Sequence, residues 1–260
     1  MQTSENTILI TGGGSGIGRA LAEAFHALGN QVVIAGRRKA VLDEVTAANP
    51  GMGSALLDIE DAATIRPFAA QVVADYPALN VVIHSAGIMR AELVQDGALD
   101  DAEATIATNL LGPIRLTAAL LPQLMAQPRA AIVTVSSGLA FMPRASTPTY
   151  NATKAAIHSY TQSLRYQLKE TSVQVLEIIP PYVQTELMGT TQANDPNAMP
   201  LRDFIGEVMA IITSQHDATE IIVERVKPLR FAEANSTYDT FFQRFNDGLS
   251  NAARQTAPHE

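Results

Sequence analysis

The chain has 260 residues, of which 47% are hydrophobic and 17% charged, and its formal net charge at pH 7 is −8. A chain of this size and apolar content can bury one large core, so we expect a single domain over residues 1–260. The negative charge argues against nucleic acid or an anionic membrane as a partner, because both attract clustered Lys and Arg. There is no cysteine, which excludes disulfides and a thiolate nucleophile. We expect a small-molecule partner and assign no metal site.

The amino-terminal residues 1–6 lack a basic segment followed by a long apolar run. No later stretch reaches the ~18 uncharged apolar residues that suggest a membrane-spanning helix. We therefore expect a cytoplasmic protein that does not enter a membrane.

The first recognisable unit is a strand, a glycine turn and a helix. Residues 7–10 are β-branched and apolar, residues 11–18 read Thr-Gly-Gly-Gly-Ser-Gly-Ile-Gly, and residues 19–25 have helical spacing. Glycines let a backbone turn tightly and approach a pyrophosphate, while the free N–H groups of the helix start face the anion. This order predicts dinucleotide binding, and a flexible glycine loop is the alternative.

Strands and helices then alternate along the chain. Buried strands are expected at residues 31–35, 54–58, 80–83, 131–135 and 173–179, with a last one at 220–226. Helices are expected at residues 40–48, 62–74, 100–125 (interrupted at Gly112-Pro113), 150–169, 201–212 and 231–245. Residues 188–200 read as a mobile loop, and the last dozen residues as frayed. The alternation predicts an α/β fold, a Rossmann-like doubly wound parallel sheet of about seven strands with helices on both faces.

Polar and small residues follow the strands that meet at one edge of this sheet. His84-Ser85-Ala86-Gly87 follows the fourth strand and Ser136-Ser137 the fifth, where an open parallel sheet holds its ligand. His84 by itself reads as a core or loop histidine. Asn109 interrupts an otherwise apolar Ala-Leu helix, which calls for a specific reason.

Tyr150 and Lys154 stand four residues apart, on one face of a predicted helix. A free tyrosine titrates near pH ~10, and a neighbouring cation favours the phenolate. The pair is therefore a candidate proton donor with a lysine that lowers its pKa, although an exposed helix turn offers the same spacing by chance.

In order and spacing, these motifs resemble the short-chain dehydrogenase/reductase family, over residues 7–187. Thr11-Gly12-xxx-Gly16-x-Gly18 resembles its cofactor loop, Ser85-Ala86-Gly87 its Asn-Ala-Gly turn, and Asn109 its helix asparagine, while Ser137 lies thirteen residues before Tyr150. The resemblance implies catalytic roles for Ser137, Tyr150, Lys154 and Asn109. It implies cofactor contacts at Gly12, Ser15, Gly16, Ile17, Gly18, Arg37, Arg38, Asp58, Ala86, Gly87, Tyr150, Lys154, Pro180, Val183 and Thr185.

Each of these residues has its own expected role in carbonyl reduction. Tyr150 would supply the proton, Ser137 would donate a hydrogen bond to the same oxygen, and Lys154 would reach the ribose hydroxyls of the cofactor. Asn109 resembles the family residue that braces a water beside the lysine, and the alternative is an amide that pins its helix. Asp58 would lie at the adenine, and the alternative is a strand-end cap.

Three features depart from the family pattern. His84-Ser85 stands where Asn-Asn is usual, and Pro180-Pro181 where Pro-Gly is usual. The usual glycine pair after the last strand is replaced by residues 225–230 and a further helix, which puts the family's tetramer in doubt. We expect a homodimer or a homotetramer, paired through the mostly apolar helices that contain Asn109 and Tyr150.

The end of the second strand bears on the choice of cofactor. An NAD site places Asp or Glu there, but residues 32–41 contain no acid and include Gly36, Arg37, Arg38 and Lys39. A guanidinium can bind a 2′-phosphate, so the sequence predicts NADP(H), with a solvated basic loop as the alternative.

The expected function is reversible reduction of a ketone or aldehyde, with Tyr150 as acid and base. A nucleotide-binding redox sensor or regulatory protein on the same fold is the alternative. An apolar substrate pocket is expected from Leu139, Phe141, Met142, Tyr182 and Met188, which could equally be core. Arg90 and Arg144 are candidates for a substrate carboxylate or for plain solvation.

Overall fold

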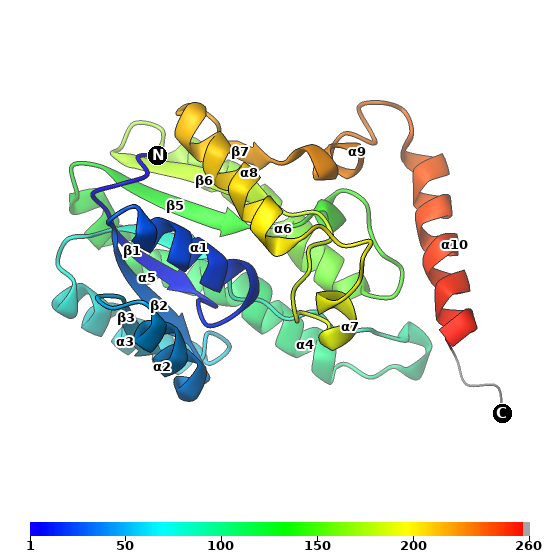
Figure 1. The fold of residues 1–260 in the computed structure, drawn as a ribbon, viewed down its shortest axis with the longest axis horizontal. Coiled ribbons are helices and arrows are strands. Elements are labelled where there is room, and N and C mark those ends of the chain that lie inside the picture. Colours follow the sequence, from blue (N-terminus) through cyan, green and yellow to red (C-terminus); the bar gives the residue numbers. More distant parts are fainter. Residues whose placement is uncertain (257–260) are drawn as a thin grey trace.

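A single parallel sheet of seven strands organises the molecule (Figure 1). The computed structural model describes the backbone of residues 1–256 and the side chains of residues 1–248. The strands stand in the order β3-β2-β1-β4-β5-β6-β7, and every adjacent pair is parallel. Their bounds are β1 Thr7–Thr11, β2 Gln31–Gly36, β3 Gly53–Leu56, β4 Leu79–His84, β5 Ala130–Val135, β6 Val173–Ile179 and β7 Glu220–Ile222. The doubly wound α/β fold predicted from the sequence is confirmed.

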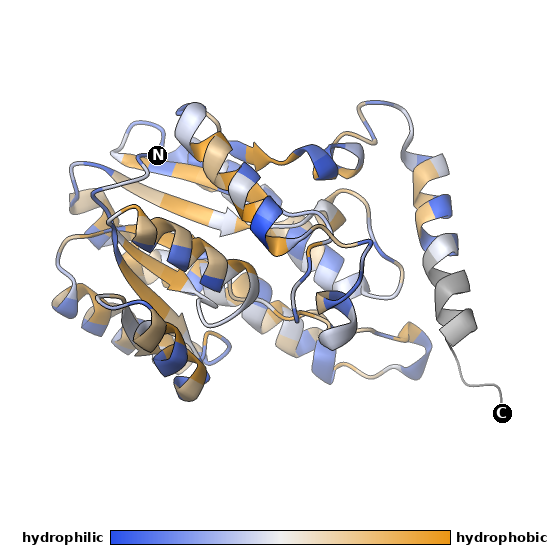
Figure 2. Ribbon diagram, viewed as in Figure 1, coloured by the Kyte–Doolittle hydropathy of each residue, from blue (hydrophilic) through white to orange (hydrophobic). Residues whose placement is uncertain are grey.

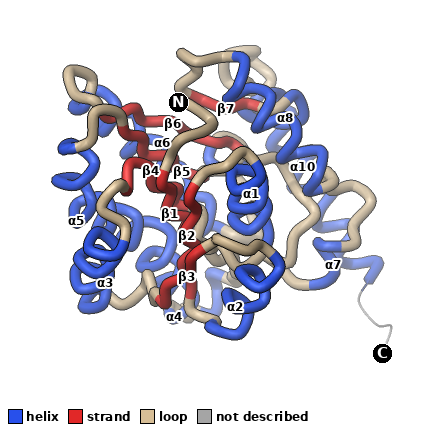
Figure 3. Tube along the Cα trace, turned by 60° about the vertical axis from the view of Figure 1, so that its left-hand side comes forward, coloured by secondary structure: helices blue, strands red, loops and turns tan. Residues whose placement is uncertain are grey.

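Helices cover both faces of the sheet, as Figure 3 shows with the strands between two helical layers. One layer contains α1 (Gly16–Ala27), α2 (Lys39–Ala48) and α8 (Leu201–Ser214), whose buried side chains share a core with the sheet. The other layer contains α3 (Ala62–Asp75), α5 (Gly112–Ala126) and α6 (Pro148–Leu168), which share a second core. The strands are largely apolar along their length, while hydrophilic residues gather on the outer faces of the helices (Figure 2).

The segment before β5 differs from the predicted interrupted helix. α4 (Asp100–Ile106) leads into a π-helical turn, η2 (Ala107–Leu111), and then directly into α5. Pro113 lies in the first turn after η2, where a missing N–H is tolerated, so Gly112-Pro113 does not break the helical path. The helical path Asp100–Ala126 is long and apolar enough to span a membrane by length and composition, a test that core helices of soluble proteins also meet. Leu116, Leu120 and Leu124 of α5 are fully buried beside the sheet.

The segment after β6 is more ordered than the sequence suggested. Residues 188–200, predicted as a loop without structure, contain the short helix α7 (Thr190–Ala193). The buried Gln192 amide donates to the Val183 carbonyl at 2.9 Å and to Thr185 Oγ1 at 3.1 Å, which fastens α7 to the segment that follows β6. A side-chain contact of this kind is not visible in a local sequence pattern.

The carboxyl-terminal elements also differ from the prediction. β7 ends at Ile222 and is followed by the 3-10 turn η4 (Glu224–Val226) and by α9 (Lys227–Arg230). The last helix, α10 (Tyr238–Thr256), begins later than residue 231 and extends beyond residue 245 into the stretch predicted to fray, of which residues 257–260 lie outside the described part. α10 lies at the side of the molecule (Figure 1), where Asn246 accepts from the Ala145 N–H at 2.7 Å.

Candidate active site

A cleft opens at the carboxyl edge of the sheet, where the strand order changes direction between β1 and β4. The predicted residues that line it are Gly12, Ser15, Gly16, Ile17, Gly18, Arg37, Arg38, Ala86, Gly87, Ser137, Tyr150, Lys154, Pro180, Val183 and Thr185. The fold therefore brings together glycine turn, basic cluster and catalytic candidates that are far apart in the sequence. Asn109 and Asp58 are not among the lining residues.

The glycine turn between β1 and α1 is closely packed against the end of β4. Gly12 has a φ of +69°, and a Cβ there would lie 2.8 Å from the Ala86 Cα. A Cβ on Gly18 would lie 2.4 Å from the Gly12 carbonyl oxygen, so neither position has room for a side chain. Thr11 Oγ1 accepts from the Ser85 and Ala86 N–H groups, both at 3.2 Å, and so joins the ends of β1 and β4. The backbone thus forms a cradle at the amino end of α1, suited to a pyrophosphate.

The three cations after β2 are not equivalent. Arg37 and Arg38 line the cleft, where an Arg38 guanidinium nitrogen lies 3.2 Å from Ser15 Oγ. Arg37 pairs with Glu60 at 3.7 Å, a partner that the local sequence did not reveal. Lys39 turns to Asp43 of its own helix at 2.6 Å and does not line the cleft. Two of the three cations are therefore placed to meet a bound anion.

Ser137, Tyr150 and Lys154 are all buried at the base of the cleft. The Lys154 Nζ lies 5.5 Å from the centre of the Tyr150 ring and donates to the Val135 carbonyl at 2.9 Å. Ser137 caps the turn η3 (Gly138–Ala140), since its Oγ accepts from the Leu139 N–H at 3.1 Å. β5 and α6 together therefore place two hydroxyls and an amine in one small space.

Burial is the main cause of the pKa shifts of Tyr150 and Lys154. It raises the pKa of Tyr150 to about 12, although a hydrogen bond with Ser137 opposes the shift. Burial also lowers the pKa of Lys154 to about 8, and the charge of Glu177 opposes that shift. The expectation that Lys154 lowers the pKa of Tyr150 below its ordinary value is thus not met. Desolvation of the phenolate sets the direction of the shift, and the Lys154 ammonium is turned toward the Val135 carbonyl.

Asn109 lies in the π-helical turn η2 and holds the segment after β4. Its Oδ1 accepts from the Ile88 N–H and its Nδ2 donates to the Ile88 carbonyl, both at 2.9 Å. A Cβ on Gly87 would lie 3.3 Å from the Asn109 Oδ1 and 3.7 Å from the Lys154 Nζ. Asn109 therefore fixes the backbone next to the lysine, and the water that it was expected to brace stays a prediction.

Asp58 and His84, two further residues discussed from the sequence, each form a hydrogen bond within the chain. The Asp58 carboxylate accepts from the Glu60 N–H at 3.2 Å, as a strand-end cap does, and its contact with adenine stays a prediction. His84 is buried, donates to or accepts from Thr117 Oγ1 at 2.9 Å, and has its pKa lowered to about 4 by burial. It is a core histidine, as the sequence suggested.

The apolar side of the cleft is built from other residues than those predicted. None of the five expected pocket residues lines the cleft, and Met142 is fully buried. Tyr182 instead donates to Asp195 at 3.1 Å, and Met188 contacts Arg144 at 3.7 Å. The apolar lining on this side comes from Ile88, Met89, Pro181 and Leu187, neighbours in sequence of Gly87, Pro180 and Thr185.

The two candidate arginines also differ in place. Arg90 lines the cleft and lies 3.7 Å from Asp101, so it has an acidic partner. Arg144 is outside the lining and donates to Ser146 Oγ at 2.9 Å. A contact of either arginine with a substrate carboxylate stays a prediction.

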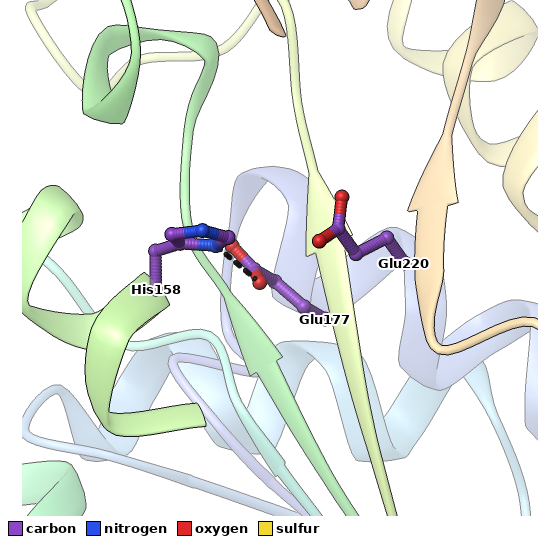
Figure 4. Close-up of side chains that lie close together, drawn as sticks. All are labelled: His158, Glu177 and Glu220. Atoms are coloured by element: carbon purple, nitrogen blue, oxygen red, sulfur yellow. Dashed lines mark hydrogen bonds and ion pairs between the residues drawn. The ribbon is translucent and has the colours of Figure 1, made fainter. Parts of the chain in front are cut away.

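A group of ionisable residues missed by the sequence analysis lies between α6 and the strands β6 and β7 (Figure 4). His158 of α6, Glu177 of β6 and Glu220 of β7 have ligand atoms within 4.8 Å of one another. His158 Nδ1 lies 2.8 Å from Glu177, whereas Glu220 accepts twice from Arg230, at 2.8 and 3.1 Å. The spacing alone would admit a cation, but the Arg230 guanidinium already provides the positive charge at Glu220.

A doubly wound parallel sheet that holds a glycine turn and a buried Ser, Tyr and Lys at its carboxyl edge is the architecture of short-chain dehydrogenases. The sequence profile described as short chain dehydrogenase matches residues 6–196, and the chain belongs to this family of oxidoreductases.

Known proteins are similar to the chain over most of its length. The uncharacterised oxidoreductase DltE of Bacillus subtilis is 39% identical over 257 residues, covering 95% of this chain and 98% of that protein. An uncharacterised oxidoreductase of Staphylococcus aureus (strain MRSA252) is 30% identical, covering 81% of this chain and 92% of that protein. Among solved structures, a serine dehydrogenase complexed with NADP+ is 26% identical with a TM-score of 0.73, covering 79% of this chain and 88% of that one. A short-chain dehydrogenase from Streptomyces avermitilis, 23% identical, shares the fold with a TM-score of 0.80 over 98% of this chain and 99% of that one.

Proposed function

We propose that the protein is an NADP(H)-dependent carbonyl reductase that uses Tyr150 as its acid. The observation that carries the proposal is the convergence of Ser137, Tyr150 and Lys154 at the base of a cleft that also contains the glycine turn. Neither Gly12 nor Gly18 has room for a Cβ, and both belong to a cradle that fits a dinucleotide pyrophosphate. A bound nicotinamide supplies the hydride in such chemistry.

The chain's own residues would handle the proton. As a carbonyl oxygen gains negative charge, the hydroxyls of Ser137 and Tyr150 can both donate to it, and Tyr150 gives up its proton. A pKa of about 12 for Tyr150 does not prevent this transfer, because an alkoxide is far more basic than a phenolate. The Lys154 ammonium, 5.5 Å from the ring centre, would then stabilise the phenolate that remains.

The preference for NADP(H) rests on Arg37 and Arg38, which both line the cleft at the end of β2. No acid stands between Val32 and Val41 that would repel a 2′-phosphate. The similarity to a serine dehydrogenase complexed with NADP+ supports the same choice. It also makes hydroxy acids a class of substrate worth including beside apolar alcohols.

The function is tested by following NADPH absorbance with a panel of ketones and aldehydes, and NADP+ reduction with secondary alcohols and short hydroxy acids. We expect turnover with at least one pair of alcohol and carbonyl compound, in both directions. Tight NADPH binding without turnover of any compound would contradict the proposal and favour a nucleotide-binding sensor.

A further inference from the structure

Glu177 is a fully buried acid whose register partner on β5 is Thr134, the neighbour of Val135, and the Val135 carbonyl accepts from Lys154. Glu177 stands on β6, its side chain is 0% exposed, and its Oε2 lies 2.8 Å from His158 Nδ1. Its other oxygen, Oε1, has no hydrogen-bond partner among the described residues. Removing a carboxylate from water costs free energy, and a positive charge nearby can compensate for that cost. Among the described residues, Lys154 is the one buried lysine or arginine, and the charge of Glu177 raises its pKa.

Lys154 needs such a counter-ion. It is 7% exposed, and its one described hydrogen bond goes to the Val135 carbonyl, which carries no formal charge. Burial favours the neutral amine and lowers the lysine pKa to about 8, while the charge of Glu177 raises it. Without that acid, the amine would lose its proton closer to neutral pH and could no longer stabilise a phenolate at Tyr150.

His158 connects this acid to the catalytic helix. It follows Lys154 by one turn of α6, and its ring contacts Phe141 edge-on at 4.7 Å between ring centres. The hydrogen bond to Glu177 fixes the carboxylate on the side of β6 that faces α6 (Figure 4). The same helix therefore carries both the lysine and the residue that holds its acid.

The other charged groups around this pair are already matched. Glu220 on β7 accepts two hydrogen bonds from Arg230, whose guanidinium also lies 4.5 Å from the Phe141 ring centre. Tyr150, on the same helix as Lys154, is the remaining titratable group found close to the ammonium in the part of the chain that the structure describes. Glu220 is thus satisfied by Arg230, whereas Glu177 is left to Lys154 and His158.

We propose that Glu177 is the buried counter-ion that keeps Lys154 protonated during catalysis, and that His158 is the positioning residue that holds its carboxylate. The proposal rests on the proposed carbonyl reduction, in which the Lys154 ammonium acts on Tyr150. Neither residue touches the reacting atoms, so both act through Lys154.

The titration of Lys154 can be measured without any enzymatic turnover. The chain has only four lysines, Lys39, Lys154, Lys169 and Lys227, so NMR of protein labelled with 13C-lysine gives few signals, and Lys154→Arg assigns the relevant one. We expect Glu177→Gln, which keeps the shape and removes the charge, to lower the Lys154 pKa by about one unit or more. Glu220→Gln is the matched control, and we expect it to leave the Lys154 pKa unchanged. An unchanged Lys154 pKa in Glu177→Gln would refute the counter-ion role.

The same variants are then compared in the pH profile of kcat/KM, which reports groups of the free enzyme. The alkaline limb should move to lower pH in Glu177→Gln by the shift found by NMR, while thermal unfolding confirms that the variant is folded. If no carbonyl compound is reduced, the proposed function fails, but the NMR titration still decides the role of Glu177. A Lys154 shift by NMR without any movement of the limb would overturn the link to catalysis.

His158 is tested by two replacements. His158→Asn keeps a donor near Nδ1 and should resemble the parent, whereas His158→Phe keeps a ring against Phe141 but should lower the Lys154 pKa. An unchanged Lys154 pKa in His158→Phe would refute the positioning role. A rise in melting temperature with Zn2+ or Mn2+ that His158→Asn abolishes would instead identify a metal site and overturn the counter-ion assignment.

Discussion

Arg37 is the residue that we propose decides the choice of cofactor. It lines the cleft and has Glu60 as its partner at 3.7 Å, with its side chain 54% exposed, so its pairing is weak enough to be exchanged for a phosphate. The neighbouring Gly36 leaves space, because a Cβ there would meet only Leu42, at 3.7 Å. The sequence predicted the cations, and the structure adds that Lys39 points elsewhere.

We predict that Arg37→Ala lowers kcat/KM with NADPH by about tenfold or more, because a charge-assisted hydrogen bond to phosphate is lost. Lys39→Ala, which removes the same charge from a residue paired with Asp43, should change it little. Gly36→Asp should shift the preference toward NADH, since a carboxylate accepts from a ribose hydroxyl and repels a phosphate. The measurement is kcat/KM for both cofactors in each variant, and a parent that prefers NADH would contradict the assignment.

At the scale of elements, His84 joins β4 to α5 through Thr117. Its pKa lies at about 4 in the folded protein, against 6.5 when exposed, because burial disfavours the charged ring. Its contribution to stability is therefore complete above pH 6.5 and is lost as the pH falls toward 4, since only the unfolded chain takes up the proton readily.

We predict that the parent loses about 2 kcal/mol more free energy of unfolding than His84→Asn between pH 7 and pH 5. Asparagine can form a hydrogen bond with Thr117 but does not titrate. The stability of His84→Asn at pH 7 therefore gives the effect of the substitution itself, apart from any titration. Urea denaturation at both pH values measures the difference. Equal losses in the two proteins would show that His84 is not the group responsible.

Elements whose signal is local were predictable from the sequence. β6 was predicted at its observed bounds, and β2 and β5 to within one residue at each end, because buried parallel strands are continuous apolar runs. The π-helical turn at Asn109 and the helix α7 were not predicted. The turn lies just before Gly112-Pro113, where the proline lacks the N–H of a regular helical hydrogen bond, and α7 is held by the buried amide of Gln192. The first residue of α10 was missed because residues 231–237 contain no Gly or Pro that would mark a break before the helix.

The candidate site likewise contains residues that the sequence predicted and residues that it did not. The glycine turn, Ser137, Tyr150 and Lys154 belong to motifs with fixed spacing, so the sequence identified them and the structure places them in one cleft. The pairing of His158 with Glu177 links α6 to β6 across 19 residues, and no local pattern announces it. The five residues expected in a substrate pocket do not line the cleft for a related reason, since apolar residues near a site can face the core, as Met142 does.

At the scale of the whole molecule, we propose that the protein forms a homo-oligomer through the outer faces of α5 and α6. Ala118 on α5 and Ala155 on α6 are exposed, and small residues allow helices to approach closely. A mostly apolar groove between α3 and α5 is lined in part by Ala118.

Light scattering at micromolar concentration should give at least twice the monomer mass of 27.8 kDa. Ala118→Arg should weaken the assembly by placing a long charged side chain in the contact, whereas Ala210→Arg, an exposed site on the opposite helical layer, should not. A monomeric parent would refute the oligomer, and an oligomer unaffected by Ala118→Arg would refute this interface.

The most direct test of the account is the turnover of Tyr150→Phe, with a carbonyl substrate that the parent reduces. The change removes the phenolic proton donor and keeps the ring, so we predict a fall in kcat of about 10² or more with NADPH binding preserved. Tyr166→Phe, on the exposed side of the same helix, should retain full activity. Turnover by Tyr150→Phe close to that of the parent would contradict the central claim that Tyr150 is the acid.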